Sequence, residues 1–282
     1  MPLTIGVISD IHYGPDACFD GQLQKMGRES LALTAAFVEA MNREVKPDFV
    51  VNLGDVVQDV DAEADLRHYE AVEEVLAGLD APLFPVVGNH DLICLTTEQV
   101  LGLWGRRGNL EGIETLGAGK LYYHVRRAGW DFIVLHSMER TRHYVWMDLE
   151  QLRWLERTLE AAEGPVMVII HHPLADQDCR GNLWFEDYPH LALVREAPSV
   201  RRLLEQSGKV RLVLNGHMHW NRVTHHAGIP YVTVQSLIEN VTGGAAGKAC
   251  EAWTVVELEP EVARVTVRGL DPANHVLPLQ TV

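Results

Sequence analysis

The sequence predicts an α/β fold built on a largely parallel sheet. Three apolar runs, at residues 3–9, 49–53 and 83–87, are separated by segments with helical periodicity at 29–44 and 62–79. The order strand, helix, strand, helix, strand is typical of right-handed βαβ units in a parallel sheet. Each apolar run also ends in polar residues, and the carboxyl ends of parallel strands are where open α/β sheets form their ligand crevices.

The remaining elements follow from periodicity and turn residues. Amphipathic patterns predict helices and β-rich runs predict strands in this order: strands 121–125 and 130–135, helix 148–162, strand 166–170, helix 199–206 and strand 210–214. Farther along, runs at 231–235, 253–258 and 263–268 indicate a closing set of antiparallel strands. Residues 92–120 are rich in glycine and predict a loop with a short helix, to which the sequence assigns no role.

Composition limits the partners and the location of the protein. The 282 residues include 39 acidic and 24 basic side chains, and this formal charge of −15 argues against broad binding to nucleic acid or anionic membranes. No signal peptide or membrane span is evident, so we expect a cytoplasmic protein. The four cysteines are widely spaced and indicate neither a zinc site nor a disulfide framework. Without a linker or a repeat, we expect one domain over residues 1–282 that closes with the β-rich segment 228–282.

Five predicted strands end in side chains that can bind metal ions or transfer protons. These are Asp10, His12, Asp55, Asn89, His90, His171, His217 and His219. A single histidine after a strand is usually structural, but repetition at five strand ends argues against coincidence. With His90 set aside, seven donors are too many for one ion that keeps a position open, so two metal ions are implied. Carboxylate, imidazole and amide donors without thiolate favour Mn, Fe, Zn or Co.

The strand ends resemble a known set of motifs. In chain order, the following are similar to the five motifs of the calcineurin-like metallophosphoesterase superfamily: Asp10-x-His12, Gly54-Asp55, Gly88-Asn89-His90-Asp91, His171-His172-Pro173 and Gly216-His217-x-His219. The resemblance spans residues 3–235 and implies a four-layer α/β/β/α sandwich. It also implies a dinuclear metal site at the C-terminal ends of the strands.

The resemblance implies a division of the ligands between two ions. One ion would take Asp10, His12, Asp55 and His219, and the other would take Asp55, Asn89, His171 and His217, with Asp55 as the bridge. The match to His-x-Pro makes His171 the ligand and His172 a supporting neighbour. Many relatives carry an acidic residue three positions after the bridging aspartate, where this chain has Gln58 followed by Asp59. Two dications, two carboxylates and one hydroxide sum to +1, a positive centre inside an acidic protein.

The expected nucleophile is a hydroxide that bridges the two ions. Metal ions lower the pKa of bound water toward about 7, and a pair of ions can clamp the attacking and leaving oxygens at phosphorus. Because Asn89 would serve as a ligand, His90 is available as a catalytic general acid or hydrogen-bond donor toward the leaving oxygen. We expect Asp91 to orient a neighbouring histidine.

These features predict a phosphodiesterase that acts on a small phosphodiester or nucleotide. The irregular segment 174–198 is the candidate substrate-facing loop, in which Trp184 and Tyr188 stack on a base or pack as core, and Arg180 meets a second phosphate. Residues 179–188 also resemble the manganese-dependent ADP-ribose/CDP-alcohol diphosphatases, so a nucleotide-diphosphate pyrophosphatase is the alternative enzyme. A non-catalytic binding scaffold on the same fold is the alternative from another class. A nuclease ranks third, and nothing in the sequence indicates an oligomeric state.

Overall fold

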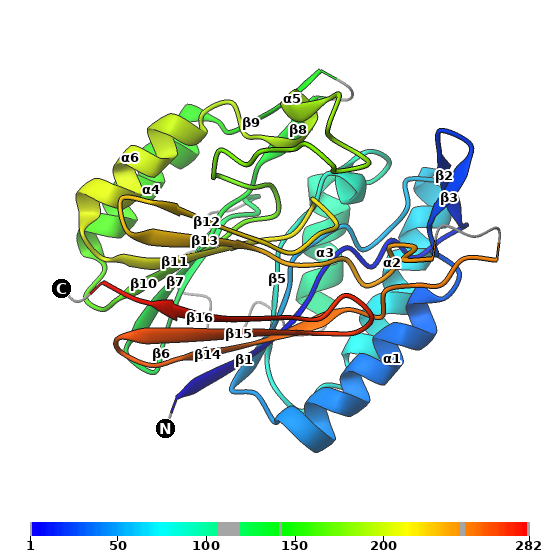
Figure 1. The fold of residues 1–282 in the computed structure, drawn as a ribbon, viewed down its shortest axis with the longest axis horizontal. Helices are drawn as coiled ribbons and strands as arrows, with labels where there is room; N and C mark the ends of the chain where they lie inside the picture. The colour runs from blue at the N-terminus through cyan, green and yellow to red at the C-terminus, as the bar shows by residue number, and fades with distance from the viewer. Residues whose placement is uncertain (1, 107–118, 141–142, 243–245, 281–282) are drawn as a thin grey trace.

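Two six-stranded sheets pack against each other between outer helices in a computed structural model (Figure 1). The structure describes residues 2–106, 119–140, 143–242 and 246–280. Helices α1, α2 and α3 lie on one side of the sheets, and α4 and α6 lie on the other. The α/β sandwich predicted from the sequence is confirmed.

The first sheet combines the predicted parallel strands with an antiparallel extension. Its strands follow the order β16-β15-β14-β1-β4-β5 and comprise β1 (Leu3–Ile8), β4 (Phe49–Asn52), β5 (Leu83–Pro85), β14 (Trp253–Leu258), β15 (Val262–Arg268) and β16 (Ala273–Pro278). β1, β4 and β5 are parallel, as βαβ units require. β14 pairs antiparallel with β1, and β15 and β16 continue antiparallel, so the two closing strands predicted at 253–258 and 263–268 are confirmed.

The second sheet has four parallel strands between two antiparallel edges. Its strands follow the order β12-β13-β11-β10-β7-β6 and comprise β6 (Tyr123–Arg127), β7 (Trp130–Val134), β10 (Val166–Ile169), β11 (Val210–Asn215), β12 (Arg222–His226) and β13 (Ile229–Thr233). The prediction that residues 231–235 form one antiparallel set with 253–258 and 263–268 is wrong, because β13 lies in the other sheet. There it runs parallel to β11, with Tyr231 opposite Val213, and antiparallel to β12. The unpredicted strand β12 reverses the chain, and the turn at Ala227 and Gly228 reverses it again.

Two of the helices begin at a capping aspartate, and one ends at a glycine. The helices are α1 (Ser30–Ala40), a π-helical turn η1 (Met41–Val45), α2 (Ala62–Leu76), a 3₁₀ turn η2 (His90–Leu92), α3 (Thr97–Arg106), α4 (Leu149–Ala161), α5 (Pro189–Ala192) and α6 (Ala197–Ser207). The Asp61 side chain caps α2 by accepting from the amides of Glu63 and Ala64, and Asp148 caps α4. Gly208 ends α6 in the left-handed conformation.

Two short hairpins lie outside the main sheets. They are formed by β2 (Ala17–Phe19) with β3 (Gln22–Lys25), and by β8 (Met138–Arg140) with β9 (Tyr144–Trp146). Neither hairpin was predicted from the sequence. Of the segment 92–120, α3 supplies the expected short helix, while residues 107–118 lie outside the described residues.

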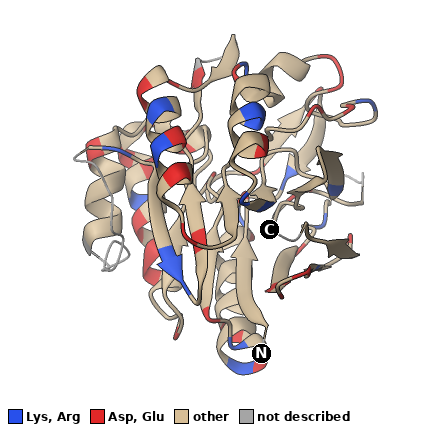
Figure 2. Ribbon diagram, turned by 90° about the vertical axis from the view of Figure 1, so that its left-hand side faces the viewer, with Lys and Arg blue, Asp and Glu red and all other residues tan. Residues whose placement is uncertain are grey.

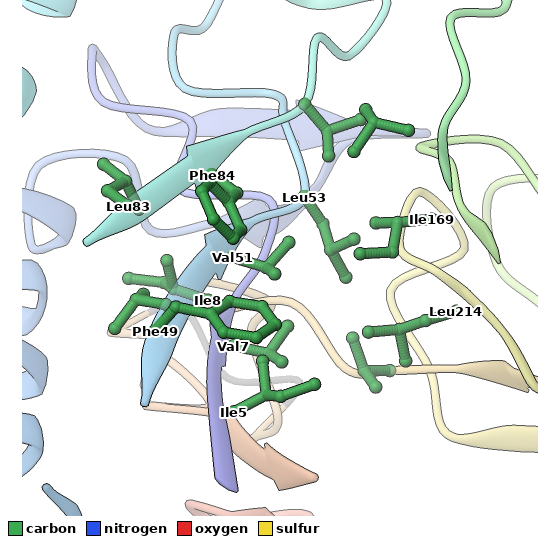
Figure 3. Close-up of a cluster of buried hydrophobic side chains, with 14 of the residues drawn as sticks. Ile5, Val7, Ile8, Phe49, Val51, Leu53, Leu83, Phe84, Ile169 and Leu214 are labelled. Carbon is green, nitrogen blue, oxygen red and sulfur yellow. The ribbon is translucent and has the colours of Figure 1, made fainter. Parts of the chain in front are cut away.

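A continuous apolar core holds the two sheets together. Side chains of the first sheet, including Val7, Phe49 and Val51, lie toward Ile169 and Leu214 of the second, and all belong to one buried cluster (Figure 3). A separate cluster fills the space between the second sheet and α4 and α6. Lys, Arg, Asp and Glu instead occur on the helices and loops and at scattered places along the strands (Figure 2). Among the described residues, no helix is both long enough and apolar enough to cross a bilayer.

Candidate active site

The loops that follow five strands meet at one edge of the sandwich. The first sheet delivers Asp10 and His12 after β1, Asp55 after β4, and Asn89 after β5, and the second delivers His171 after β10, and His217 and His219 after β11. All seven side chains predicted to bind metal are at most 9% exposed and lie together here. Each sheet therefore contributes part of a single cluster.

One group of donor atoms surrounds the side chains of Asp10 and His12. The Nε2 atoms of His12 and His219 are 3.2 Å apart. Nε2 of His219 lies 3.4 Å from Oδ1 of Asp10, and Nε2 of His12 lies 3.5 Å from Oδ2 of Asp55. These four residues are the set that the sequence resemblance implies for one ion.

A second group adjoins the first through Asp55. Nε2 of His171 lies 3.1 Å from Oδ1 of Asn89, 3.2 Å from Nδ1 of His217 and 3.3 Å from Oδ2 of Asp55. The same Asp55 oxygen is 3.5 Å from His12 Nε2 in the first group. One carboxylate oxygen thus lies between the two groups, which is the position of a bridging ligand.

The far side of several candidate ligand side chains is held by a hydrogen bond. Nδ1 of His171 lies 2.8 Å from the Leu53 carbonyl oxygen, and Nδ1 of His219 lies 2.6 Å from Oε2 of Glu239. Because each acceptor takes the ring N–H, the lone pair of the opposite nitrogen faces the cluster. The side-chain amide of Asn89 donates to Glu139 at 2.7 Å, which turns the Asn89 oxygen inward.

His217 is held in the opposite ring orientation. Its Nε2 lies 3.2 Å from the Leu191 carbonyl oxygen, so Nδ1 is the atom that faces the cluster. Its backbone N–H also donates to both carboxylate oxygens of Asp10, at 3.1 and 3.2 Å. The loop after β11 in the second sheet is thereby tied to the loop after β1 in the first.

The ligand loops adopt strained backbone and pack very closely. Asp10, His12, Asp55, His217 and His219 all have positive φ, between 46° and 67°. Residues other than glycine rarely adopt this left-handed backbone conformation, which costs about 1–2 kcal/mol per residue. Two motif glycines serve the same close packing, because a Cβ at Gly88 would collide with Asp55, and one at Gly216 would collide with Ser9 and Asp10. Such strain persists where the surrounding structure fixes it, and it is common at functional sites.

The electrostatics of the cluster keep Asp55 ionised but act in opposite directions on its histidines, since the pKa of His219, like that of His171, is raised by a nearby carboxylate despite burial. Burial would raise the pKa of Asp55, but neighbouring imidazoles, above all His171, hold it well below its usual range. Burial lowers the pKa of His12, as does the nearby Lys25 cation, and burial lowers the pKa of His217 to about 3. Against burial, the Asp55 carboxylate raises the pKa of His171 to about 9, so a metal ion must displace a proton there. Ionised carboxylates and neutral imidazoles are the forms that bind metal.

A cavity of about 1110 Å³ opens onto the cluster. Its lining includes Trp184 and Tyr188 from the predicted substrate-facing segment, and also Phe19 from the β2–β3 hairpin. Arg180 is not among the lining residues; its side chain is 83% exposed and pairs with Asp178. The structure therefore separates Arg180 from the two aromatic residues with which the sequence analysis grouped it.

A model of the calcineurin-like phosphoesterase family matches residues 3–221. The chain belongs to the calcineurin-like phosphoesterase family. The phosphoesterase is 26% identical over 259 residues to a Fibrobacter succinogenes protein named as a probable cyclic nucleotide phosphodiesterase, and the alignment covers 90% of this chain and 89% of that protein. It is also 26% identical over 202 residues to a probable glycerophosphodiester phosphodiesterase of Arcobacter nitrofigilis, covering 68% of this chain and 66% of that protein.

Solved structures show the same fold. A dimetal phosphatase from Danio rerio superimposes with a TM-score of 0.78 at 19% identity, over 99% of this chain and 100% of that chain. At this identity the likeness concerns the arrangement of sheets and helices.

Asp91 supports the site of this phosphoesterase through the backbone. Its carboxylate accepts hydrogen bonds from the amides of Val56 at 2.7 Å, Gly88 at 2.9 Å and Asp55 at 3.0 Å. The expectation that Asp91 orients a histidine is wrong, because these amides occupy its oxygens. Burial, together with the Asp55 carboxylate, raises the pKa of Asp91 to about 7. Asp91 therefore joins the loop after β4 to the loop after β5.

His172 lies behind the cluster. Its Nδ1 is 2.8 Å from the Ser137 hydroxyl, and its ring packs on His217 with centroids 4.1 Å apart. The buried Nε2 of His172 has no hydrogen-bond partner among the described residues. A ring nitrogen of His172 also lies within 4.8 Å of those of His171 and His217.

His90 lines the cavity beside the cluster. Its backbone N–H donates to Oδ1 of Asp55 at 2.9 Å, while its Nδ1 lies 3.4 Å from Asp59. Asp59 thus approaches His90 although it is displaced by one position from the family pattern. A ring nitrogen of His90 also falls within 4.8 Å of ligand-type atoms of His12 and Asp55.

Sequence reasoning missed three side chains that contact the motif residues. Lys25 lies between His12 and His90, Glu239 accepts from His219, and Glu139 accepts from Asn89. None lies beside a motif in the chain. The sequence carries no periodic or spacing signal that could have identified them.

Proposed function

We propose that this phosphoesterase hydrolyses small phosphodiesters with the aid of two divalent metal ions. The observation that carries the proposal is the position of Asp55 Oδ2, which lies 3.5 Å from His12 Nε2 and 3.3 Å from His171 Nε2. Asp10, His12 and His219 complete one donor set, and Asn89, His171 and His217 complete the other. The donor atoms converge with lone pairs inward, so the residues fit two ions.

The donor chemistry narrows the choice of metals. Both sets combine imidazole nitrogen with carboxylate oxygen, and one adds an amide oxygen. Such mixed sets without thiolate suit Mn, Fe, Zn or Co. When bound, the ions supply a nucleophile from water at neutral pH and stabilise the charge on the phosphoryl oxygens.

The protein side chains supply positioning and proton transfer. Asn89 is held by Glu139 so that its oxygen faces His171, and His217 is held by the Leu191 carbonyl. His90 lines the cavity without belonging to either donor set, so it can donate a proton to the departing ester oxygen. Asp59, 3.4 Å from His90 Nδ1, orients that ring.

The cavity favours a substrate with a flat group. Phe19 and Trp184 lie with ring centroids 5.1 Å apart, and Tyr188 lines the same space. Aromatic faces of this kind stack on nucleobases. We therefore place a nucleoside-containing phosphodiester first, in keeping with the names of the relatives. Because Arg180 lies away from the cavity lining, it gives no support to a diphosphate substrate.

Hydrolysis of bis(p-nitrophenyl) phosphate tests the proposal. Metal-free protein would be reconstituted separately with Mn, Fe, Zn and Co, and then assayed against phosphomonoesters, phosphodiesters and pyrophosphates. We expect two ions per chain by elemental analysis and a preference for diesters. The Asp55→Asn variant should lose metal and activity, whereas Asp187→Asn, at an exposed position, should keep both. Absence of hydrolysis with every metal would favour a binding scaffold instead.

A further inference from the structure

Lys25 is a buried cation inside the candidate active site that no motif includes. It ends β3, is 5% exposed and lines the cavity. Its Nζ lies 3.4 Å from Nε2 of His90 and 3.5 Å from Nδ1 of His12, and 5.0 Å from the centre of the Trp184 ring. The ammonium group is therefore surrounded by the residues expected to meet substrate.

The charge of Lys25 lacks a direct counterion. Within the described ranges, no carboxylate oxygen lies within 4.0 Å of its Nζ, although Asp55 and Glu239 act on it from farther away. A buried ammonium group without a paired anion is costly to keep. Two divalent ions in the site would add further positive charge, so they would not neutralise Lys25. An anion that enters the cavity is the partner that fits this group.

The position of Lys25 is fixed by its surroundings. Residue 25 forms a backbone bridge with residue 239, and the neighbouring Met26 amide donates to the Ile238 carbonyl at 3.0 Å. Trp184 covers the ammonium group from the substrate-facing segment. A charge held in place before the reaction costs little reorganisation when a negative charge develops beside it.

The contact with His90 places Lys25 on the side of the substrate from which the ester oxygen would depart. Donor atoms 3.4 Å apart can both reach a single oxygen at about 2.8 Å. If His90 protonates the departing ester oxygen, Lys25 Nζ can contact the same oxygen. The contact with His90 therefore gives Lys25 a more specific role than offsetting the negative charge of the nearby carboxylates.

We propose that Lys25 is a catalytic residue that donates a hydrogen bond to the departing ester oxygen and stabilises its negative charge. In the step, water loses one proton to solvent and its oxygen forms the new bond to phosphorus, the bond from phosphorus to the ester oxygen breaks, and a proton from solvent later restores His90. The electron pair stays on that oxygen, which takes a proton from His90, while Lys25 keeps its own protons. This role rests on the proposed phosphodiesterase function.

The test is a series of aryl phosphodiesters whose leaving phenols become progressively less acidic. The Lys25→Met variant keeps much of the aliphatic stem and removes the charge. Loss of one such donor typically costs about 10²–10³ in kcat. We expect a loss of this size with the poorest leaving group, a clearly smaller loss with p-nitrophenolate, and an unchanged metal content. Lys120→Met, which removes a lysine paired with Glu150 outside the cavity lining, is the matched control and should leave the series unchanged.

The outcomes separate this proposal from the function on which it rests. Wild-type protein that hydrolyses no diester overturns the proposed function and this role together. An active wild type with a uniform loss across the series in Lys25→Met, or with no loss, overturns the role of Lys25 alone. Loss of bound metal in that variant would indicate a structural role. If Lys25→Met does not fold, Lys25→Gln, which removes the charge but retains a donor, is assayed by the same criterion.

Discussion

The Asp91→Ala substitution should lower the free energy of unfolding, because backbone amides that donate to the Asp91 carboxylate would lose their acceptor. The buried N–H groups of Asp55, Val56 and Gly88, the three that donate to Asp91 at 3.0 Å or less, would lose their acceptor, and so would the N–H of Val57, which donates at 3.4 Å. Each unsatisfied buried donor costs about 1–3 kcal/mol, which gives roughly 3–9 kcal/mol for three. Because water can enter the vacated space, and because the substitution also removes the cost of burying the Asp91 charge that the raised pKa reflects, we expect the lower end of that range, about 3 kcal/mol.

Urea denaturation of the metal-free protein measures this cost. Working at about pH 8.5 keeps the Asp91 carboxylate ionised, since its pKa is about 7. Asp187→Ala, at an exposed position, serves as the control and should stay within about 0.5 kcal/mol of wild type. A change below about 1 kcal/mol in Asp91→Ala would refute the conclusion that its three hydrogen bonds hold the loops together.

Three further predictions concern single residues of the site and its surroundings. His90→Ala should retain both metal ions and lose about 10²–10⁴ in kcat, and unchanged turnover of a diester with a poor leaving group would contradict its role. Glu239→Gln should weaken metal affinity by about 10–100-fold in a chelator competition, because the acceptor for His219 Nδ1 loses its charge; equal affinity would exclude this support. Burial lowers the pKa of His136 to about 4 from an ordinary 6.5. As the pH falls, this imidazole is therefore protonated in the unfolded chain before it is protonated in the folded protein. Stability should therefore decrease from pH 6.5 toward pH 4, and His136→Gln should flatten the decrease in urea denaturation at several pH values; an identical slope would show that other groups cause it.

The central strands and their polar ends could be predicted because they depend on local patterns. The strand predicted at 49–53 is buried throughout and apolar except for Asn52, as expected where both faces of a sheet are covered, and Asp55 follows it after Gly54. β12 and β16 carry mixed burial patterns with polar and basic residues, so their sequences resemble loops. The parallel direction of β13 depends on the reversal at β12, which local periodicity does not encode.

The metal-binding cluster was predictable only for residues inside motifs. Asp55 and His171 lie 116 positions apart in the chain, yet the resemblance groups them, and their side chains are 3.3 Å apart. Lys25 and Glu239 reach the same site through a hairpin and a late loop, where no sequence pattern marks them. The assignment of individual roles to these residues, like the single-domain organisation, stays a prediction that the experiments above address.

The division of the donors between the two sheets has a consequence for the biogenesis of the protein. Asp10 and His12 leave the ribosome early in synthesis, whereas His217 and His219 follow about 200 residues later. On the proposed assignment, each ion draws on both sheets, so neither ion finds its full set of donors on a nascent chain that has made only the parallel strands β1, β4 and β5 of the first sheet. Metal insertion would then come late, after the halves of the sandwich have associated. The apo chain must reach that stage through its apolar core alone.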